Sequence, residues 1–192
     1  MSSLRERRRV ETTQEIQEAA LRLAAELGVD NVTVEVICNE VGISPRTFFN
    51  YFPARDAAFA MSPPPFGSAA EEAFVEGKGT LLDDFIELFA CQLERLNANP
   101  RIPRLMREIA MSSPRMFAMQ LSKLHEREKE VAGLVARRLG LMEPDIMCIV
   151  LAGAMLGAVR AVILTWTENP QEDVRDVLRR DLAHLKLLNR ND

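Results

Sequence analysis

The stretch TVEVICNEVGISPRTFFNYF, residues 33–52, decides the fold of this 192-residue chain. Its apolar residues recur at helical spacing in two short runs, which predicts helices at 34–41 and 45–51. A tight turn that contains Gly42 separates them. Two short helices joined in this way form a helix-turn-helix, a motif whose second helix enters the major groove of DNA.

Both helices carry local start and stop signals. Thr33 and Ser44 precede the two runs and are preferred N-cap residues. Pro45 then occupies the first helical position, where its missing N–H costs nothing. Gly42 ends the first of the two helices, because glycine accepts the left-handed backbone of a helix end.

The second helix has two different faces at about 100° per residue. Phe48 and Phe52 share the face expected to point inward, together with Pro45. Arg46 and Asn50 lie on the opposite face. Arginine pairs with guanine and asparagine with adenine in the major groove, so these two are the predicted base contacts.

The remaining side chains of this helix are also unusual. Thr47 and Tyr51 lie one turn apart and offer two hydroxyls to phosphates. An ordinary core helix explains buried phenylalanines, but it does not explain Phe49, which is expected to face solvent.

The residues before this motif predict one more helix. Thr12 and Glu15 match a capping box, so we expect the helix to begin at Thr12 and to end at Gly28. Residues 1–11 are then a polar arm with four arginines in five positions. Such an arm either contacts DNA or remains a solvated tail.

The residues after the motif predict an all-α protein. A short helix is expected at 54–60 and an irregular linker at 61–68, where three consecutive prolines interrupt any helix. Further helices are predicted at 69–75, 80–97, 102–111, 115–139, 144–167 and 172–188. We therefore divide the chain into a domain at 1–60 and a second domain at 61–192. Phe59 and Met61 are expected to pack between the first domain and the helix at 102–111.

Composition favours a helical protein in a reducing compartment. Hydrophobic residues make up 47% of the chain and charged residues 27%. Cys38, Cys91 and Cys148 are too dispersed for a disulfide framework or a metal centre, and no signal peptide precedes them. We expect a cytoplasmic protein without a metal or another cofactor. The net charge of −4, with seven arginines and nine acidic residues in 1–60, means that DNA binding requires local placement of charge.

No catalytic motif is present, so we do not expect an enzyme. The chain contains no GxSxG, phosphate-loop or dinucleotide motif. Lys129 follows His125-Glu126 where a zinc protease needs histidine.

The apolar run at 146–164 allows two interpretations. Its nineteen residues approach the length of a membrane span, but Arg160 interrupts them and many are only Ala or Gly. We favour a buried helix of a soluble protein. Gly153, Gly157 and Ala161 recur every four residues and form a flat face suited to close helix packing.

The motif resembles the N-terminal DNA-binding domain of the TetR/AcrR family of transcriptional regulators. The resemblance covers about residues 10–60 and rests on the threonine before the second helix, the Gly-Ile-Ser turn, the Thr-Phe-Phe run and the Tyr-Phe ending. It implies three N-terminal helices and a larger C-terminal domain that binds an effector and forms a dimer. A homodimer on a double-stranded DNA operator, released by a small and mostly apolar effector, is the expected mode of action.

The resemblance also implies roles for individual residues. Phosphate contacts are implied for Thr33, Thr47, Tyr51 and Arg55, and contacts with bases or the groove wall for Ser44, Pro45, Arg46 and Asn50. Phe49 stands where the family usually has tyrosine, so stacking or methyl contact replaces one phosphate hydrogen bond. Arg55 replaces the usual lysine and keeps its charge.

The C-terminal residues give weaker signals. Aromatic and methionine side chains on several helix faces, with charges at the edge of one of them, are the candidate effector pocket: Phe85, Phe89, Met106, Met116, Met119, Arg127, Glu128, Met147 and Met155. These methionines fit ordinary core packing equally well. The helix at 115–139 is expected to bury Phe117, Leu121, Leu124, Val131, Val135 and Leu139. The candidate dimer surface comprises Gly153, Gly157, Ala161, Val174, Leu178, Leu182 and Leu185.

One alternative function remains open at this point. The acidic N-terminal domain and the missing tyrosine at Phe49 also fit a ligand-binding or sequestering protein whose helix-turn-helix no longer binds DNA.

Overall fold

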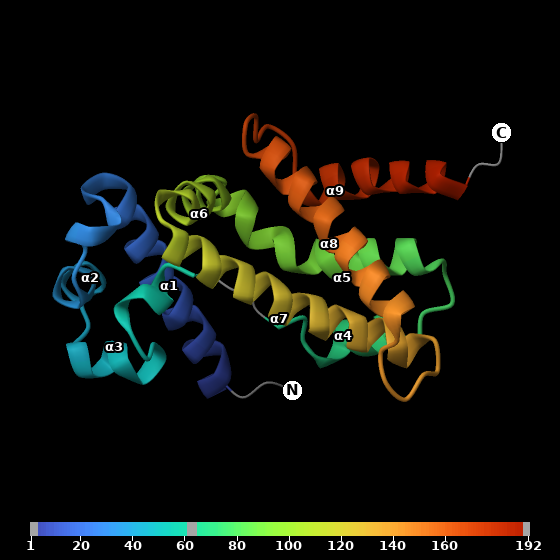
Figure 1. Ribbon diagram of the computed structural model, residues 1–192, viewed down its shortest axis with the longest axis horizontal. Coiled ribbons are helices and arrows are strands. Elements are labelled where there is room, and N and C mark those ends of the chain that lie inside the picture. The colour runs from blue at the N-terminus through green and yellow to red at the C-terminus, as the bar shows by residue number, and fades with distance from the viewer. Residues whose placement is uncertain (1–3, 61–64, 190–192) are drawn as a thin grey trace. The chain divides into compact units, whose positions relative to one another are not determined.

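The computed structural model describes the backbone of residues 4–60 and 65–189, and their side chains except at 4–7, 94–98 and 188–189. Within these ranges the secondary structure is entirely helical, as predicted, with nine α-helices and three short 3₁₀ helices (Figure 1). The linker predicted at 61–68 lies partly outside the described residues, and α4 begins at Ser68.

The helices form two compact units. The first consists of residues 1–62 and 102–124, and the second of residues 63–101 and 125–192. This grouping differs from a division at residue 60, because 102–124 pack with the N-terminal helices. Ile102, Ile109 and Met116 belong to the same buried cluster as Phe48 and Phe59.

The first unit contains the helix-turn-helix. Its elements are α1 (Leu4–Leu27), η1 (Val29–Asn31), α2 (Val34–Val41), α3 (Pro45–Tyr51), η2 (Arg55–Ala58), α6 (Arg101–Ser112) and the first half of α7 (Pro114–Arg138). The predicted bounds of α2 and α3 are confirmed. The short helix expected at 54–60 is the 3₁₀ turn η2, and Gln17 of α1 donates a hydrogen bond to the Ala60 carbonyl beyond it at 3.3 Å.

The predicted start of the first helix is wrong. Helix α1 begins at Leu4 and not at Thr12, so residues 4–11 are helical and not an irregular arm. Arginine, glutamate and leucine are strong helix formers, and they continue the helix upstream of the capping box. Thr13 fits inside this helix because its hydroxyl donates to the Arg9 carbonyl at 2.8 Å.

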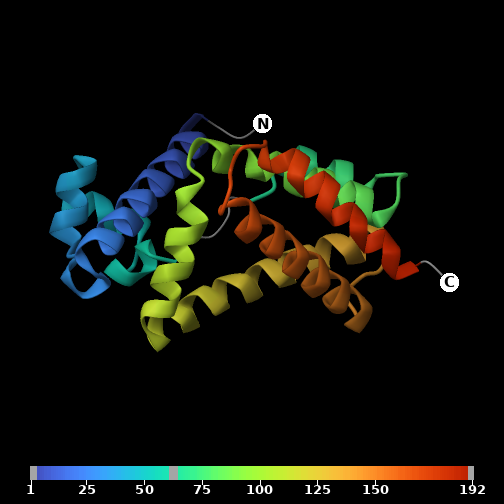
Figure 2. The same cartoon turned by 90° about the horizontal axis from the view of Figure 1, so that it is seen from above.

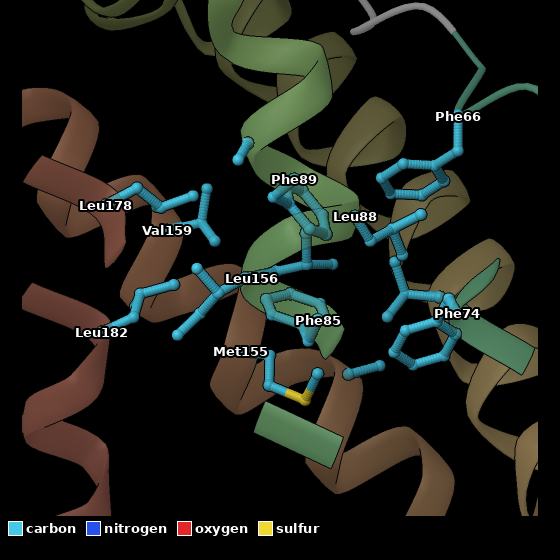
Figure 3. Packing of buried hydrophobic residues seen from close by; sticks show 14 of the residues in the cluster. Phe66, Phe74, Phe85, Leu88, Phe89, Met155, Leu156, Val159, Leu178 and Leu182 are labelled. Atoms are coloured by element: carbon cyan, nitrogen blue, oxygen red, sulfur yellow. The ribbon is translucent and has the colours of Figure 1, made fainter. Parts of the chain in front are cut away.

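The second unit is built from α4 (Ser68–Val75), α5 (Leu81–Ala98), the second half of α7, α8 (Ile146–Trp166), α9 (Val174–Leu182) and η3 (Ala183–Asn189). Aromatic and aliphatic side chains from α5, α8 and α9 meet in its core (Figure 3). Phe85 and Phe89 stack with centroids 4.5 Å apart, and Phe66 meets Phe89 edge-on at 4.9 Å. Arg138 fixes one end of this unit, because it donates hydrogen bonds to the Phe74 and Gly79 carbonyls.

Helix α9 buries its apolar face within its own chain. It lies along α5 and α8 (Figures 1 and 2), and Val174, Leu178 and Leu182 are fully buried there. These three predicted dimer-surface residues are therefore covered by their own chain, and Leu185 also packs against this core; a role of α9 in a dimer stays a prediction. The regular spacing of these residues correctly indicated that one face of α9 is buried. The face is covered by other helices of the same chain.

Helix α8 is buried along one face only. Its inner face contributes Cys148, Ala152 and Met155 to the core, whereas Ile149 and Val150 are exposed. It is the one helix in the described residues that is long and apolar enough to cross a membrane, and about a third of its apolar window is buried. One such helix is weak evidence for a span.

Helix α7 is less buried than its sequence predicts. Val131 and Val135 are buried in the second unit, but Phe117, Leu121 and Leu139 are largely exposed. A continuous apolar stripe cannot be covered throughout, because this helix passes from one compact unit into the other.

Candidate nucleic-acid interface

The helix-turn-helix is held by two side-chain caps. The Ser44 hydroxyl accepts from the Thr47 amide at 3.1 Å, and the two hydroxyl oxygens lie 2.9 Å apart. Thr33 accepts from the Val36 amide at 3.3 Å and caps α2. Gly42 has φ of +76°, a conformation that other residues adopt only with strain. These contacts fix the start of each helix.

Helix α3 presents the predicted outer face. Phe48 and Phe52 are buried, with ring centroids 5.4 Å apart, whereas Arg46 and Asn50 are exposed. Within the described part of the chain, neither exposed side chain has a hydrogen-bonding or ionic partner. Pro45 is exposed and not on the inner face, because it lies at the open end of a seven-residue helix.

The two aromatic residues beside this face have different environments. Phe49 is 55% exposed and contacts only the edge of Phe48 among the aromatic rings, at 5.5 Å. Tyr51 is half buried, and the guanidinium of Arg9 lies 5.7 Å from its ring centroid. The helical extension at the start of α1 therefore brings a cation to the end of α3, which sequence reasoning missed because it placed Arg9 in an irregular arm.

Arg55 is held inside the first unit. Its Nε donates to Asp56 at 2.8 Å, and its Nη1 donates to the Val32 carbonyl at 3.0 Å. Asp56 is buried and also pairs with Arg115 of α7 at 2.7 Å. Sequence reasoning missed both Asp56 and Arg115, since nothing local to either residue indicates that α7 packs beside η2.

A negative charge lies at the start of α2. Hydrogen bonds from its own backbone and from Thr33 lower the pKa of Glu35 below its ordinary value, so this carboxylate is ionised at neutral pH. It lies two residues before Ile37, on the exposed side of the helix. Any phosphate bound at Thr33 would therefore meet a nearby anion.

The predicted effector residues belong to both compact units. Phe85, Phe89, Arg127 and Met155 are buried in the second unit, and Glu128 is half buried there. Met106, Met116 and Met119 belong to the hydrophobic cluster of the first unit, and Met147 is exposed. The nine residues are therefore divided between the two units, because 102–124 fold with the N-terminal helices, and a common effector pocket stays a prediction.

Arg127 is a charged residue that is buried in the second unit. Only 7% of this residue is exposed, and its guanidinium lies 4.6 Å from the ring centroid of Phe66 and 2.8 Å from Glu130. Burial lowers the pKa of Arg127 and raises the pKa of Glu130. A desolvated cation of this kind is suited to bind the polar end of an otherwise apolar molecule.

The first unit contains a small hollow between η2, α6 and α7. Its volume is about 180 Å³, part of which is open to solvent, and it is lined by Phe59, Ala60, Met106, Ile109, Ala110, Met116 and Gln120. Drug-sized ligands occupy pockets of about 300 Å³ or more, so this hollow is smaller than a typical effector site. No cluster of three potential metal ligands occurs among the described residues.

Comparison with protein-family models identifies the family to which the chain belongs. Residues 16–60 match the model of bacterial regulatory proteins of the tetR family, and residues 100–187 match that of the MftR C-terminal domain. The chain belongs to the TetR/AcrR family of transcriptional regulators. It is accordingly a DNA-binding helix-turn-helix regulator with a C-terminal ligand-binding domain, in a family whose members are generally not enzymes.

Solved structures of other TetR/AcrR regulators have the same fold. FadR from Bacillus subtilis in complex with stearoyl-CoA is 15% identical, with a TM-score of 0.58 over 90% of this chain and 96% of that one. Thermus thermophilus FadR in complex with lauroyl-CoA is 19% identical, with a TM-score of 0.55 over 91% and 93%. A TetR-family regulator from Syntrophomonas wolfei is 17% identical, with a TM-score of 0.60 over 93% and 94%. No curated protein sequence matches the chain significantly.

Proposed function

We propose that this TetR/AcrR protein is a dimeric repressor in the cytoplasm that binds a palindromic operator and leaves it when an apolar effector binds. One observation carries the DNA-binding part of the proposal. Arg46 and Asn50 are exposed on a capped helix whose opposite face is buried, and neither is engaged by another described side chain. A helix of this kind is able to bind base edges without first breaking internal contacts.

The remaining contacts follow the positions of the side chains. Thr33, Ser44 and Thr47 lie at the two capped helix starts, where backbone N–H groups and hydroxyls suit phosphate oxygens. Pro45 and Phe49 are exposed beside the base-contacting face and are suited to the groove wall and thymine methyl groups. Tyr51 and Arg55 complete the proposed phosphate contacts, with Arg9 as an addition from α1.

The proposed effector is a long-chain acyl compound. Two structural neighbours were solved with a fatty acyl-CoA, which is the reason for choosing this class. The core of the second unit is rich in aromatic groups and contains one thioether, with Phe85, Phe89 and Met155 close together (Figure 3), and such groups suit acyl chains. Arg127 is the candidate to bind the polar end.

The proposed dimer surface is the outer face of α8. Ile149, Val150, Gly157 and Ala161 are exposed on it, and Gly153 is partly exposed. Its small residues permit close approach of a second helix, and its apolar residues would otherwise face water. Two half-sites bound by one dimer then add their binding energies.

A gel-shift titration with the DNA that flanks the protein's own coding region tests the proposal. We expect a specific complex whose affinity falls with salt, and release of the DNA when stearoyl-CoA is added. The alternative, a ligand-binding protein with a degenerate helix-turn-helix, predicts stearoyl-CoA binding without any specific DNA complex.

Replacing Arg127 with methionine tests the effector site separately. We expect weaker binding of stearoyl-CoA with DNA affinity unchanged. Arg137→Met is the matched control, because Arg137 lies on the same helix but is exposed. Equal effects of the two substitutions on ligand binding would rule out Arg127 as the anchor.

A further inference from the structure

A buried carboxylate joins two arginines from distant parts of the sequence. One oxygen of Asp56, Oδ1, accepts from Nε and lies 2.8 Å from Nη2 of Arg55. The other oxygen, Oδ2, lies 2.7 Å from Nη2 of Arg115. Asp56 is almost fully buried, whereas the Arg115 side chain is 73% exposed. Arg115 therefore forms an ion pair with a buried carboxylate, although its own side chain is exposed and not part of the core.

Arg55 connects this carboxylate to the start of α2. Its Nη1 donates to the carbonyl of Val32, the residue directly before the N-cap Thr33. A guanidinium has five N–H donors, and these contacts engage three of its nitrogens with one donor each. Two donors remain for a phosphate oxygen. The same side chain is thus able to brace the backbone at Val32 and to contact DNA.

We propose that Arg115 is a positioning residue for DNA binding, which acts through Asp56 on Arg55 and thereby on the N-terminus of α2. While Arg115 holds Oδ2, Arg55 shares only Oδ1 and keeps Nη1 directed at Val32. When Arg115 is removed, both carboxylate oxygens become available to Arg55. A two-pronged pairing with Asp56 then draws the guanidinium away from Val32 and from the phosphate.

Arg115 lies on the helix that both compact units share. It lies in the first turn of α7, a single helix that continues to Val131 and Val135 in the core of the second unit. A displacement of α7 along or about its axis moves Arg115 relative to Asp56. The ion pair therefore lies at one end of a helix whose other end belongs to the core of the second unit.

A double-mutant cycle on the full-length protein tests this inference, which rests on the proposed DNA binding. Arg115→Gln, Asp56→Asn and the double variant are titrated with the DNA flanking the coding region at several salt concentrations. We expect Arg115→Gln to weaken binding by about threefold to tenfold and to have no further effect when Asp56 is already replaced. Arg115→Lys restores the affinity, because an exposed side chain is able to bring an ammonium to the same oxygen.

Arg104→Gln is the matched control, since Arg104 is equally exposed in the same unit and, among the described side chains, pairs with Glu108 alone. The salt slope of Arg115→Gln is expected to equal that of this control. A slope flatter by about one unit would mean that Arg115 itself contacts a phosphate, which overturns the proposal. Additive effects of Arg115→Gln and Asp56→Asn, or an unchanged affinity, overturn it as well.

Hydrogen exchange without DNA separates this inference from the proposed function. Arg115→Gln is expected to speed amide exchange at 29–41, the segment that contains the start of α2, and Arg104→Gln is not. If the wild type binds no DNA specifically, the proposed function fails. Faster exchange at 29–41 in Arg115→Gln would still support the role of Arg115 in holding Arg55 at the Val32 carbonyl. Unchanged exchange would reject that role.

Discussion

At the scale of single residues, DNA recognition depends on side chains that are exposed because their neighbours are buried. Phe48 and Phe52 anchor α3 to the core and leave Arg46 and Asn50 outside. The contacts of these two with bases are direct, whereas the hydroxyls at Thr33 and Thr47 already serve as caps or cap partners. Base contacts and phosphate contacts should therefore respond differently to mutation.

We expect Asn50→Ala or Arg46→Ala to cost about 1–3 kcal/mol per half-site and to relax specificity at one base pair. Tyr51→Phe should weaken binding equally on all sequences, because a phosphate contact carries no base information. Titrations against operator variants measure this difference. If Asn50→Ala weakens binding to every variant equally, Asn50 does not contact a base.

Phe49→Tyr is expected to strengthen DNA binding. Phe49 is more than half exposed, so an added hydroxyl remains in solvent and is able to reach a phosphate. One such hydrogen bond is worth about 0.5–1.5 kcal/mol per half-site. Phe117→Tyr, at a similarly exposed phenylalanine of α7, is the control and should leave binding unchanged. Equal affinities of Phe49→Tyr and the wild type would show that no phosphate lies within reach.

At the scale of secondary-structure elements, local signals predicted α2 and α3 and placed α4 to α8 within about two residues, but they missed the start of α1. Thr33, Gly42 and Ser44 fix the ends of α2 and α3 through contacts with residues at most four positions away. The start of α1 was missed because a capping box at Thr12 competes with favourable helix formers upstream. The same limit applies to the candidate site. Asp56 is adjacent to its partner Arg55 in the sequence, but Arg115, the second partner of Asp56, is distant in the sequence and no local signal predicts the pair.

The cap of α3 has two roles that substitution at Ser44 is able to separate. Ser44→Ala removes the hydrogen bond to the Thr47 amide and should lower stability by about 1 kcal/mol. Ser44→Asp retains a capping oxygen and should preserve the melting temperature, but its charge repels phosphate and should abolish DNA binding. Thermal melting and gel shifts on both variants measure the two effects. Wild-type DNA affinity in Ser44→Asp would place Ser44 away from the DNA.

At the scale of the whole molecule, the sequence shows which faces are apolar but not which chain covers them. The stripe on α9 is buried by α5 and α8 of the same chain, whereas the outer face of α8 remains uncovered. Similarly, the methionines of α6 and α7 recur at the same helical spacing as those of α8, yet they pack in the first unit and not in the second. Periodicity is a property of one helix, and assignment to a unit depends on contacts distant in sequence.

Ala161→Glu is expected to weaken the dimer by about tenfold or more, because two carboxylates would meet across a closely packed face. The melting temperature at low protein concentration should change little, since Ala161 is exposed within the chain. Light scattering across a dilution series measures the dissociation. Met142→Glu, at a fully exposed residue before α8, is the control, and a loss of dimer there but not at Ala161 would place the interface elsewhere.

Phe59 is the residue whose replacement should affect communication more than binding. It is buried in the first unit, where it lines the same hollow as Met106 of α6 and Met116 of α7. Met61, the other expected contact, lies outside the described residues. An effector in the second unit changes DNA affinity only if its binding favours a different arrangement of elements shared with the DNA-binding helices. Helix α7 is such an element, and Phe59 packs in the same cluster as its first turns.

Phe59→Leu retains an apolar side chain but removes the ring against which α6 and α7 pack. We expect dimerisation and stearoyl-CoA affinity to stay near the wild type, while the ratio of DNA affinities without and with stearoyl-CoA falls toward one. Phe52→Leu is the matched control, because Phe52 is also buried in this unit but does not line the hollow. Operator titrations with and without stearoyl-CoA give both ratios. If Phe59→Leu retains the wild-type ratio, Phe59 only fills the core, and the connection between effector and DNA does not depend on its ring.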